Sequence, residues 1–176
     1  GAGAWGTARA WLLAGKGERV RLWAFEPEVA AGIAAAHENK LYLPGVALPA
    51  ALEPTTSLEE AVFGVEAVIF VVPSHAAAKV AAALAPHLPA GVPVITATKG
   101  IEPAKLRLMS ALLEETLPPS RGPVFALSGP SFAVEVCKHL PTAVVLAGPS
   151  GPQASALQSL LMSPTFRVYL SEDRCG

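Results

Sequence analysis

The chain begins with the stretch Gly1-Ala2-Gly3-Ala4-Trp5-Gly6, which has the pattern G-x-G-x-x-G. In a dinucleotide-binding turn the first glycine permits a tight bend, the second lets the backbone approach a pyrophosphate, and the third lets the new helix pack against a sheet. The N-terminus of that helix offers unpaired N–H groups and a partial positive charge to the phosphates. Glycine-rich turns are common, so the pattern alone is weak, and its context has to decide.

The residues that follow supply this context. Residues 7–13 predict a helix that Gly15-Lys16-Gly17 ends, and residues 18–25 predict a strand. Glu26 comes after that strand, 20 residues beyond Gly6, at the spacing of about 20 expected for an acid that reaches an adenosine ribose. Turn, helix, strand and acid in this order favour one mononucleotide-binding half of a dinucleotide-binding domain over a chance glycine turn.

The rest of the chain alternates strands with helices. Strands are predicted over residues 52–55, 67–72, 92–97, 124–127, 143–147 and 166–169, and helices over 27–36, 76–85, 103–116, 132–138 and 153–162. A loop over residues 37–45 and a helix capped by Ser57, with Glu60 completing a capping box, are also expected. The alternation predicts an α/β domain over residues 1–176 with a doubly wound, mostly parallel Rossmann-type sheet. Its first strand is missing, because no residue precedes the glycine turn.

Composition excludes several classes of protein. The 176 residues are 52% hydrophobic and 15% charged, with a net charge of −1 and no basic stripe, which argues against disorder and against a nucleic-acid partner. Cys137, Cys175 and the four histidines lack the spacing of a metal site, so two reduced thiols in a cytoplasmic protein are expected. Prolines and glycines interrupt the uncharged stretches 80–98 and 140–166, so no membrane span is expected.

Polar residues follow several of the predicted strands. In such sheets ligands bind beyond the carboxyl ends of the strands. The residues at those ends are Glu26, Ser74, His75, Lys99, Ser128 and Ser131. An ammonium at Lys99, beside Gly100, is suited to neutralise a phosphate or polarise a carbonyl oxygen, whereas most lysines are solvated surface residues.

Two other features have two readings each. The stretch Ser128-Gly129-Pro130-Ser131 precedes a predicted helix, so it is suited to hold an anion or to act as an ordinary N-cap. Trp5, inside the glycine turn, is either a packing residue or a wall against the cofactor.

As a set, these motifs resemble NAD(P)-dependent glycerol-3-phosphate dehydrogenase. The matching stretches occur in family order and cover nearly the whole chain: GAGAWGTA (1–8), HENKLYLPG (37–45), VPSH (72–75), TKGIE (98–102), LSGPSFA (127–133) with Glu135, LPTA (140–143) and FRVY (166–169). The resemblance implies hydride transfer between NAD(P)H and dihydroxyacetone phosphate. The product is sn-glycerol 3-phosphate, for glycerophospholipid synthesis.

The resemblance also implies roles for individual residues. Lys99 resembles a catalytic lysine that touches both cofactor and substrate. The implied cofactor contacts are Gly1, Gly3, Ala4, Trp5 and Gly6 in the turn, Phe25 and Glu26 at the adenosine ribose with Tyr42 nearby, Lys99, and Ala133; the implied substrate contacts are Lys99, Gly129 and Ser131. Because the Glu26 carboxylate repels a 2′-phosphate, NAD is expected to be preferred over NADP.

The chain departs from the family pattern in its extent. The family's helical C-terminal domain carries a second, proton-transferring lysine and a phosphate-binding arginine, and a homodimer is possible through it. These residues are expected beyond Gly176, so the 176-residue chain is expected to be inactive and poorly stable. Arg174 stands where the family is usually apolar.

Two other functions remain open. One is a non-catalytic nucleotide-binding Rossmann module. The other is a different β-hydroxyacid-type dehydrogenase, against which the stretches 37–45 and 127–133 argue.

Overall fold

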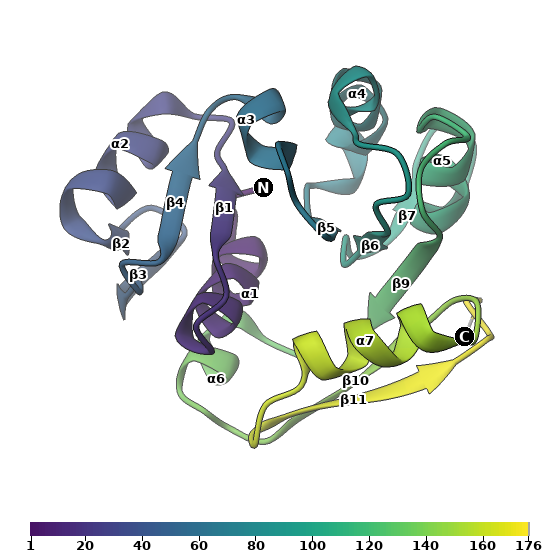
Figure 1. The fold of residues 1–176 in the computed structure, drawn as a ribbon. Coiled ribbons are helices and arrows are strands. Elements are labelled where there is room, and N and C mark those ends of the chain that lie inside the picture. Colours follow the sequence, from purple (N-terminus) through teal and green to yellow (C-terminus); the bar gives the residue numbers. More distant parts are fainter. Residues whose placement is uncertain (176) are drawn as a thin grey trace.

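A computed structural model describes residues 1–175, and its strands form two separate parts of a sheet (Figure 1). In the smaller part β1 (Val20–Trp23) pairs in parallel with β4 (Leu52–Thr55). The larger part has the order β11-β10-β9-β6-β5. Its strands are β5 (Val68–Phe70), β6 (Val94–Thr96), β9 (Val124–Ser128), β10 (Thr142–Ala147) and β11 (Phe166–Ser171). All its pairs are parallel except β9 with β10, so the predicted mostly parallel α/β sheet is confirmed.

Helices connect these strands. They are α1 (Ala4–Gly15), α2 (Pro27–Ala36), α3 (Leu58–Val62), α4 (Ser74–Leu84), the 3₁₀ turn η1 (Ala85–His87), α5 (Met109–Thr116), α6 (Ala133–Cys137) and α7 (Pro152–Leu161). Local signals explain several starts. Pro27 opens α2 at a first-turn position, and the Ser57 hydroxyl accepts the Glu60 N–H at 3.2 Å to cap α3. None of the helices described is long and apolar enough to cross a membrane.

A gap separates β1 from β5. Among the described residues, β1 pairs only with β4 and β5 pairs only with β6, so the facing edges of β1 and β5 carry no strand partner. Between them lies a cavity of about 540 Å³, whose lining includes Gly1, Val20 and Ile69. The sheet is interrupted where the first strand was expected.

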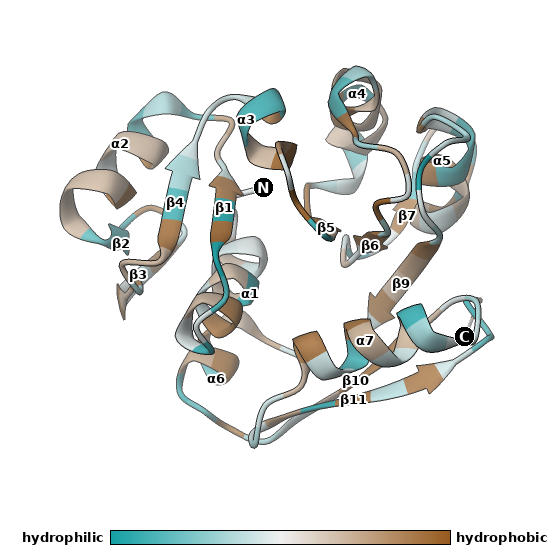
Figure 2. Ribbon diagram, in the orientation of Figure 1, coloured by the Kyte–Doolittle hydropathy of each residue, from teal (hydrophilic) through white to brown (hydrophobic). Residues whose placement is uncertain are grey.

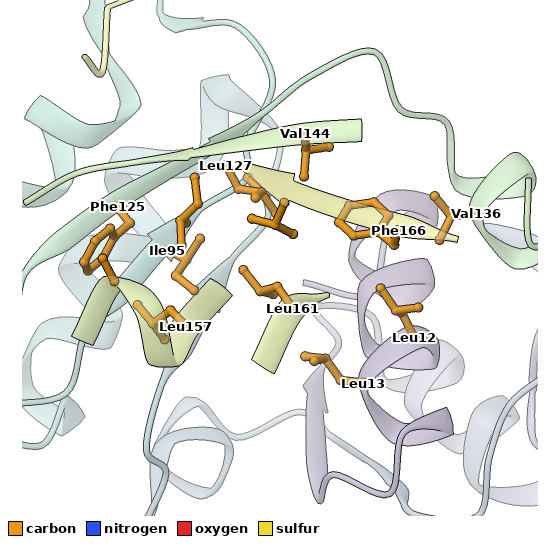
Figure 3. Close-up of a cluster of buried hydrophobic side chains, with 14 residues drawn as sticks. Leu12, Leu13, Ile95, Phe125, Leu127, Val136, Val144, Leu157, Leu161 and Phe166 are labelled. Carbon is orange, nitrogen blue, oxygen red and sulfur yellow. The ribbon is translucent and has the colours of Figure 1, made fainter. Parts of the chain in front are cut away.

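Apolar side chains fill the space between α1, α7 and the larger part of the sheet, in which strands β5, β6 and β9 are mostly hydrophobic (brown in Figure 2). Leu12 and Leu13 of α1 approach Phe166 of β11 and Leu161 of α7 (Figure 3). The face of α1 that begins at the glycine turn is therefore fixed against the sheet.

Two segments differ from the sequence prediction. The helix predicted over residues 103–116 begins only at Met109, because the Glu102 carboxylate accepts the N–H groups of Ala104 and Lys105 at 2.9 Å each and forms a turn. Short strands β7 (Ile101–Glu102) and β8 (Arg107–Leu108) pair across this turn.

The predicted loop 37–45 also contains strand structure. It holds β2 (Glu38–Asn39) and the start of β3 (Leu43–Ala47), which pair antiparallel. Local propensity did not indicate this pair.

Candidate functional site

The glycine turn is a tight contact between backbone segments. A Cβ on Gly6 would lie 1.9 Å from the Gly1 carbonyl oxygen, and a Cβ on Gly1 would lie 2.5 Å from the Val71 carbonyl oxygen. A side chain at either position therefore requires the backbone to move. The first and third positions of the motif are therefore glycine because other backbone atoms lie too close to leave room for a side chain.

Gly3 has the opposite environment. It is the N-cap of α1, and a Cβ added to it would meet no atom within 4 Å. No side chain caps this helix and no acidic residue occupies its first turn, where Ala4 and Trp5 lie. The start of α1 thus has uncapped N–H groups beside an exposed glycine, which suits the phosphates of a dinucleotide.

Buried polar side chains hold the turn in place. The Asn39 amide donates from Nδ2 to the Ala2 carbonyl oxygen and to the Thr7 hydroxyl, both at 2.8 Å, and the Thr7 hydroxyl donates to the same carbonyl at 3.2 Å. Thr7 and Asn39 are 0% and 1% exposed. Neither residue was predicted to have a role from the sequence. The available signal was a lone asparagine in the stretch 37–45.

The same asparagine connects the turn to Glu26. Its Oδ1 accepts the Tyr42 N–H at 3.1 Å, and the Tyr42 hydroxyl donates to the Glu26 carboxylate at 2.7 Å. This hydrogen bond raises the pKa of Tyr42. Tyr42 thus lies beside Glu26, and its position near the adenosine ribose stays a prediction. Phe25 is 71% exposed and packs edge-on against Trp23, with ring centroids 6.3 Å apart.

Lys99 lies at a second cavity, of about 360 Å³, beyond the ends of β6 and β9. Its Nζ donates to the Ser131 carbonyl oxygen at 2.9 Å, and Ser131 itself is 2% exposed. Gly129 lines the same cavity with φ +152°, and a Cβ there would lie 2.8 Å from the Ala143 carbonyl oxygen. Lys99, Gly129 and Ser131 are therefore brought together as a cationic, partly enclosed site suited to a polar ligand.

Trp5 joins this cavity to the glycine turn. It lines the cavity and also packs against the apolar core, so the packing reading is confirmed, while its role as a wall against the cofactor stays a prediction. Ser128 lies in the same lining, whereas Ser74, His75, Glu26 and Ala133 do not. Ala133 is half-buried at the start of α6, two residues after Ser131.

The cysteines and histidines form no metal site in the part of the chain that the structure describes. Cys137 and Cys175 are free thiols. Burial raises the pKa of Cys137 to about 11, so this thiol stays protonated at neutral pH.

Comparison with known proteins gives one consistent family. The model of NAD-dependent glycerol-3-phosphate dehydrogenase N-terminus matches residues 1–153. Glycerol-3-phosphate dehydrogenase [NAD(P)+] of Moorella thermoacetica is 48% identical over 177 residues, covering 100% of this chain and 52% of the relative. The corresponding protein of Geobacter metallireducens is 46% identical, with 100% and 53% covered. The chain thus spans about half the length of these curated relatives.

Solved structures of similar fold include members of the same family. The crystal structure of glycerol-3-phosphate dehydrogenase from Coxiella burnetii superposes with a TM-score of 0.92 at 36% identity, covering 99% of this chain and 53% of that one. A ketopantoate reductase from Ralstonia eutropha, at 20% identity and a TM-score of 0.71, shares the fold alone and covers 98% of this chain and 55% of its own. The chain belongs to the family of the NAD-dependent glycerol-3-phosphate dehydrogenase N-terminus.

Proposed function

We propose that this chain is the cofactor-binding part, over residues 1–176, of an enzyme that reduces dihydroxyacetone phosphate to sn-glycerol 3-phosphate with NAD(P)H. The observation that carries the proposal is the placement of the Lys99 ammonium. It lies at the cavity beside Gly129 and Ser131, and Trp5 of the glycine turn lines the same cavity. The family match over residues 1–153 supports the same reaction.

We assign each residue of this site a role in binding the cofactor or the substrate. When bound, the reduced nicotinamide supplies the hydride. The turn formed by Gly1, Gly3 and Gly6 receives the pyrophosphate at the N-terminus of α1. Lys99 donates a hydrogen bond to the substrate carbonyl oxygen and stabilises the negative charge that develops there. Ser131 holds the ammonium through its carbonyl oxygen, and Gly129 leaves room for the substrate.

The adenosine end is the basis for cofactor choice. Glu26 presents a carboxylate that Tyr42 orients, and Phe25 offers an exposed aromatic face. We propose that Glu26 accepts hydrogen bonds from the ribose hydroxyls, so that NAD(H) is preferred and NADP(H) is disfavoured.

We also propose that residues outside 1–176 complete the enzyme. One further strand fills the gap between β1 and β5, whose facing edges carry no strand partner among the described residues. A helical domain supplies the proton-transferring lysine, the phosphate-binding arginine and any dimer interface. We place this enzyme in the cytoplasm, where its free thiols stay reduced, and in glycerophospholipid synthesis.

The test is an assay of the complete protein. Consumption of NADH is followed with dihydroxyacetone phosphate and, as a matched control, with dihydroxyacetone, while NADH binding is measured separately by calorimetry. We expect turnover only with the phosphorylated substrate. Tight NADH binding without turnover of dihydroxyacetone phosphate would instead support a non-catalytic nucleotide-binding module.

A further inference from the structure

Arg9 is a buried cation without an anionic partner among the described residues. It is 2% exposed and lies at the lining of the cavity between β1 and β5, and within residues 1–175 its Nε, Nη1 and Nη2 atoms have no hydrogen-bond partner. None of the ion pairs among the described residues includes it. Burying an unpaired charge is costly, so its place in the interior requires a physical reason.

Two aromatic rings enclose the guanidinium. Its Cζ lies 4.1 Å from the centroid of the Trp5 ring and 3.8 Å from the centroid of the Phe166 ring. Trp5 and Arg9 are four residues apart on α1, where side chains share one face, and Phe166 belongs to β11. The stack therefore links the first turn of α1 to the far edge of the sheet.

The stack continues to the candidate site. The Lys99 Nζ lies 5.4 Å from the Trp5 centroid and 5.4 Å from the centroid of Phe132. Phe166, Arg9, Trp5, Lys99 and Phe132 thus form an alternating series of rings and cations. Arg9 lies outside the lining of the Lys99 cavity, whereas Trp5 forms part of it.

We propose that Arg9 is a positioning residue: clamped between Phe166 and Trp5, it fixes the Trp5 ring as the wall of the Lys99 cavity. Cation–π attraction is strongest where the cation is desolvated, as it is here. This inference rests on the proposed function in one respect, that the nicotinamide end of the cofactor occupies the Lys99 cavity. A rigid Trp5 wall then favours binding of that end and leaves the adenosine end unaffected.

The test compares Arg9→Met and Arg9→Lys with Arg167→Met, a control at an exposed arginine next to Phe166. In the complete protein, calorimetry measures the Kd of NADH and of ADP-ribose, which lacks the nicotinamide. Arg9→Met should weaken NADH binding by about fivefold while changing ADP-ribose binding by less than about twofold. Arg9→Lys, which keeps the cation, should recover most of the loss. Equal weakening of both ligands would overturn the proposal.

A second measurement needs no ligand. In protein labelled with 5-fluorotryptophan, the Trp5 resonance is assigned by its absence in Trp5→Phe. It should shift or broaden in Arg9→Met and stay unchanged in Arg167→Met; an unchanged resonance in Arg9→Met would overturn the proposal. If Arg9→Met does not fold, Arg9→Lys should show a smaller shift of the same resonance. If the parent binds neither ligand, the proposed function is wrong, and the resonance alone decides the role of Arg9.

Discussion

The two ends of the candidate site are held by different kinds of contact. At the adenosine end, Glu26, Tyr42 and Asn39 form a chain of hydrogen bonds that reaches the Ala2 carbonyl oxygen in the glycine turn. At the other end, the Trp5 ring stacks on the buried Arg9 guanidinium and lies near the exposed Lys99 ammonium.

The contacts at the two ends differ in how strictly they fix geometry and in how far water reaches them. Hydrogen bonds define distance and direction, but Glu26 and Tyr42 lie where water competes for them, so each bond contributes a small net free energy. The Arg9 guanidinium is 2% exposed between two rings, and this exclusion of water strengthens its interactions, whereas the Lys99 ammonium is exposed to solvent. We therefore expect changes at the Lys99 end to alter the reaction rate and changes at the Glu26 end to alter cofactor affinity and choice.

The largest expected effect is that of Lys99→Ala in the complete enzyme. Loss of a donor aimed at developing charge lowers kcat by about 10²–10³-fold in comparable sites. Steady-state kinetics should show this loss together with an unchanged melting temperature. Lys79→Ala, an exposed lysine on α4, is the control. Near-normal kcat/KM in Lys99→Ala would show that Lys99 takes no part in the reaction.

Asn39→Ala tests the link between Glu26 and the glycine turn. The change leaves the Thr7 hydroxyl with one partner fewer and removes two further hydrogen bonds in a buried setting, which costs about 1–3 kcal/mol of stability. Denaturant unfolding of the complete protein measures this loss, with Lys40→Ala as the exposed control. Since the turn is loosened, binding of ADP-ribose should weaken as well. An unfolding free energy equal to that of the control would contradict the structural role.

The preference for NADH over NADPH tests the role of Glu26 at the adenosine end. We expect kcat/KM to be about tenfold or more higher with NADH than with NADPH, because the Glu26 carboxylate repels a 2′-phosphate and each 1.4 kcal/mol is tenfold. Glu26→Gln removes the charge and should reduce the ratio of kcat/KM with NADH to kcat/KM with NADPH. Glu28→Gln, two residues further on, should leave this ratio unchanged. An equal or better kcat/KM with NADPH in the parent enzyme would refute the role of Glu26.

The smallest effect is expected for Tyr42→Phe. Removing one exposed, charge-assisted hydrogen bond should weaken NADH binding by about threefold. The Tyr42 hydroxyl donates only while protonated, and its pKa is raised above the ordinary value of 10.0. The difference between parent and variant should therefore persist from pH 7 to pH 9. A difference that vanishes within this range, measured by calorimetry, would exclude the Tyr42–Glu26 bond as its origin.

Local patterns predicted much of this molecule. Helix α2 and strand β4 have the predicted bounds, Glu26 and Lys99 follow strands β1 and β6 as expected, and the glycine turn opens helix α1. These features depend on residues close together in the sequence, so their signals are visible there.

Long-range contacts were not predictable in the same way. The start of α5 depends on a turn closed by Glu102, and the support of the glycine turn depends on a bond between Ala2 and Asn39, 37 residues apart. Arg9 was read simply as part of a helix. Its position four residues before Leu13 and three before Leu12 places it on the buried face, and this was the signal available.

The gap between β1 and β5 has a consequence for the order of folding. The β1–β4 pair joins Val20 to Leu52, 32 residues apart, and the β5–β6 pair joins Val68 to Val94, 26 residues apart, so each pair closes a loop of similar length within its own part of the sheet. Both pairs should therefore become protected before the two parts of the sheet join. Pulse-labelling hydrogen exchange during refolding of the complete protein can measure this: the amides of β1 and β5 that pair with β4 and β6 should gain protection earlier than the amides that face the gap, and simultaneous protection would indicate that both parts form in one cooperative step.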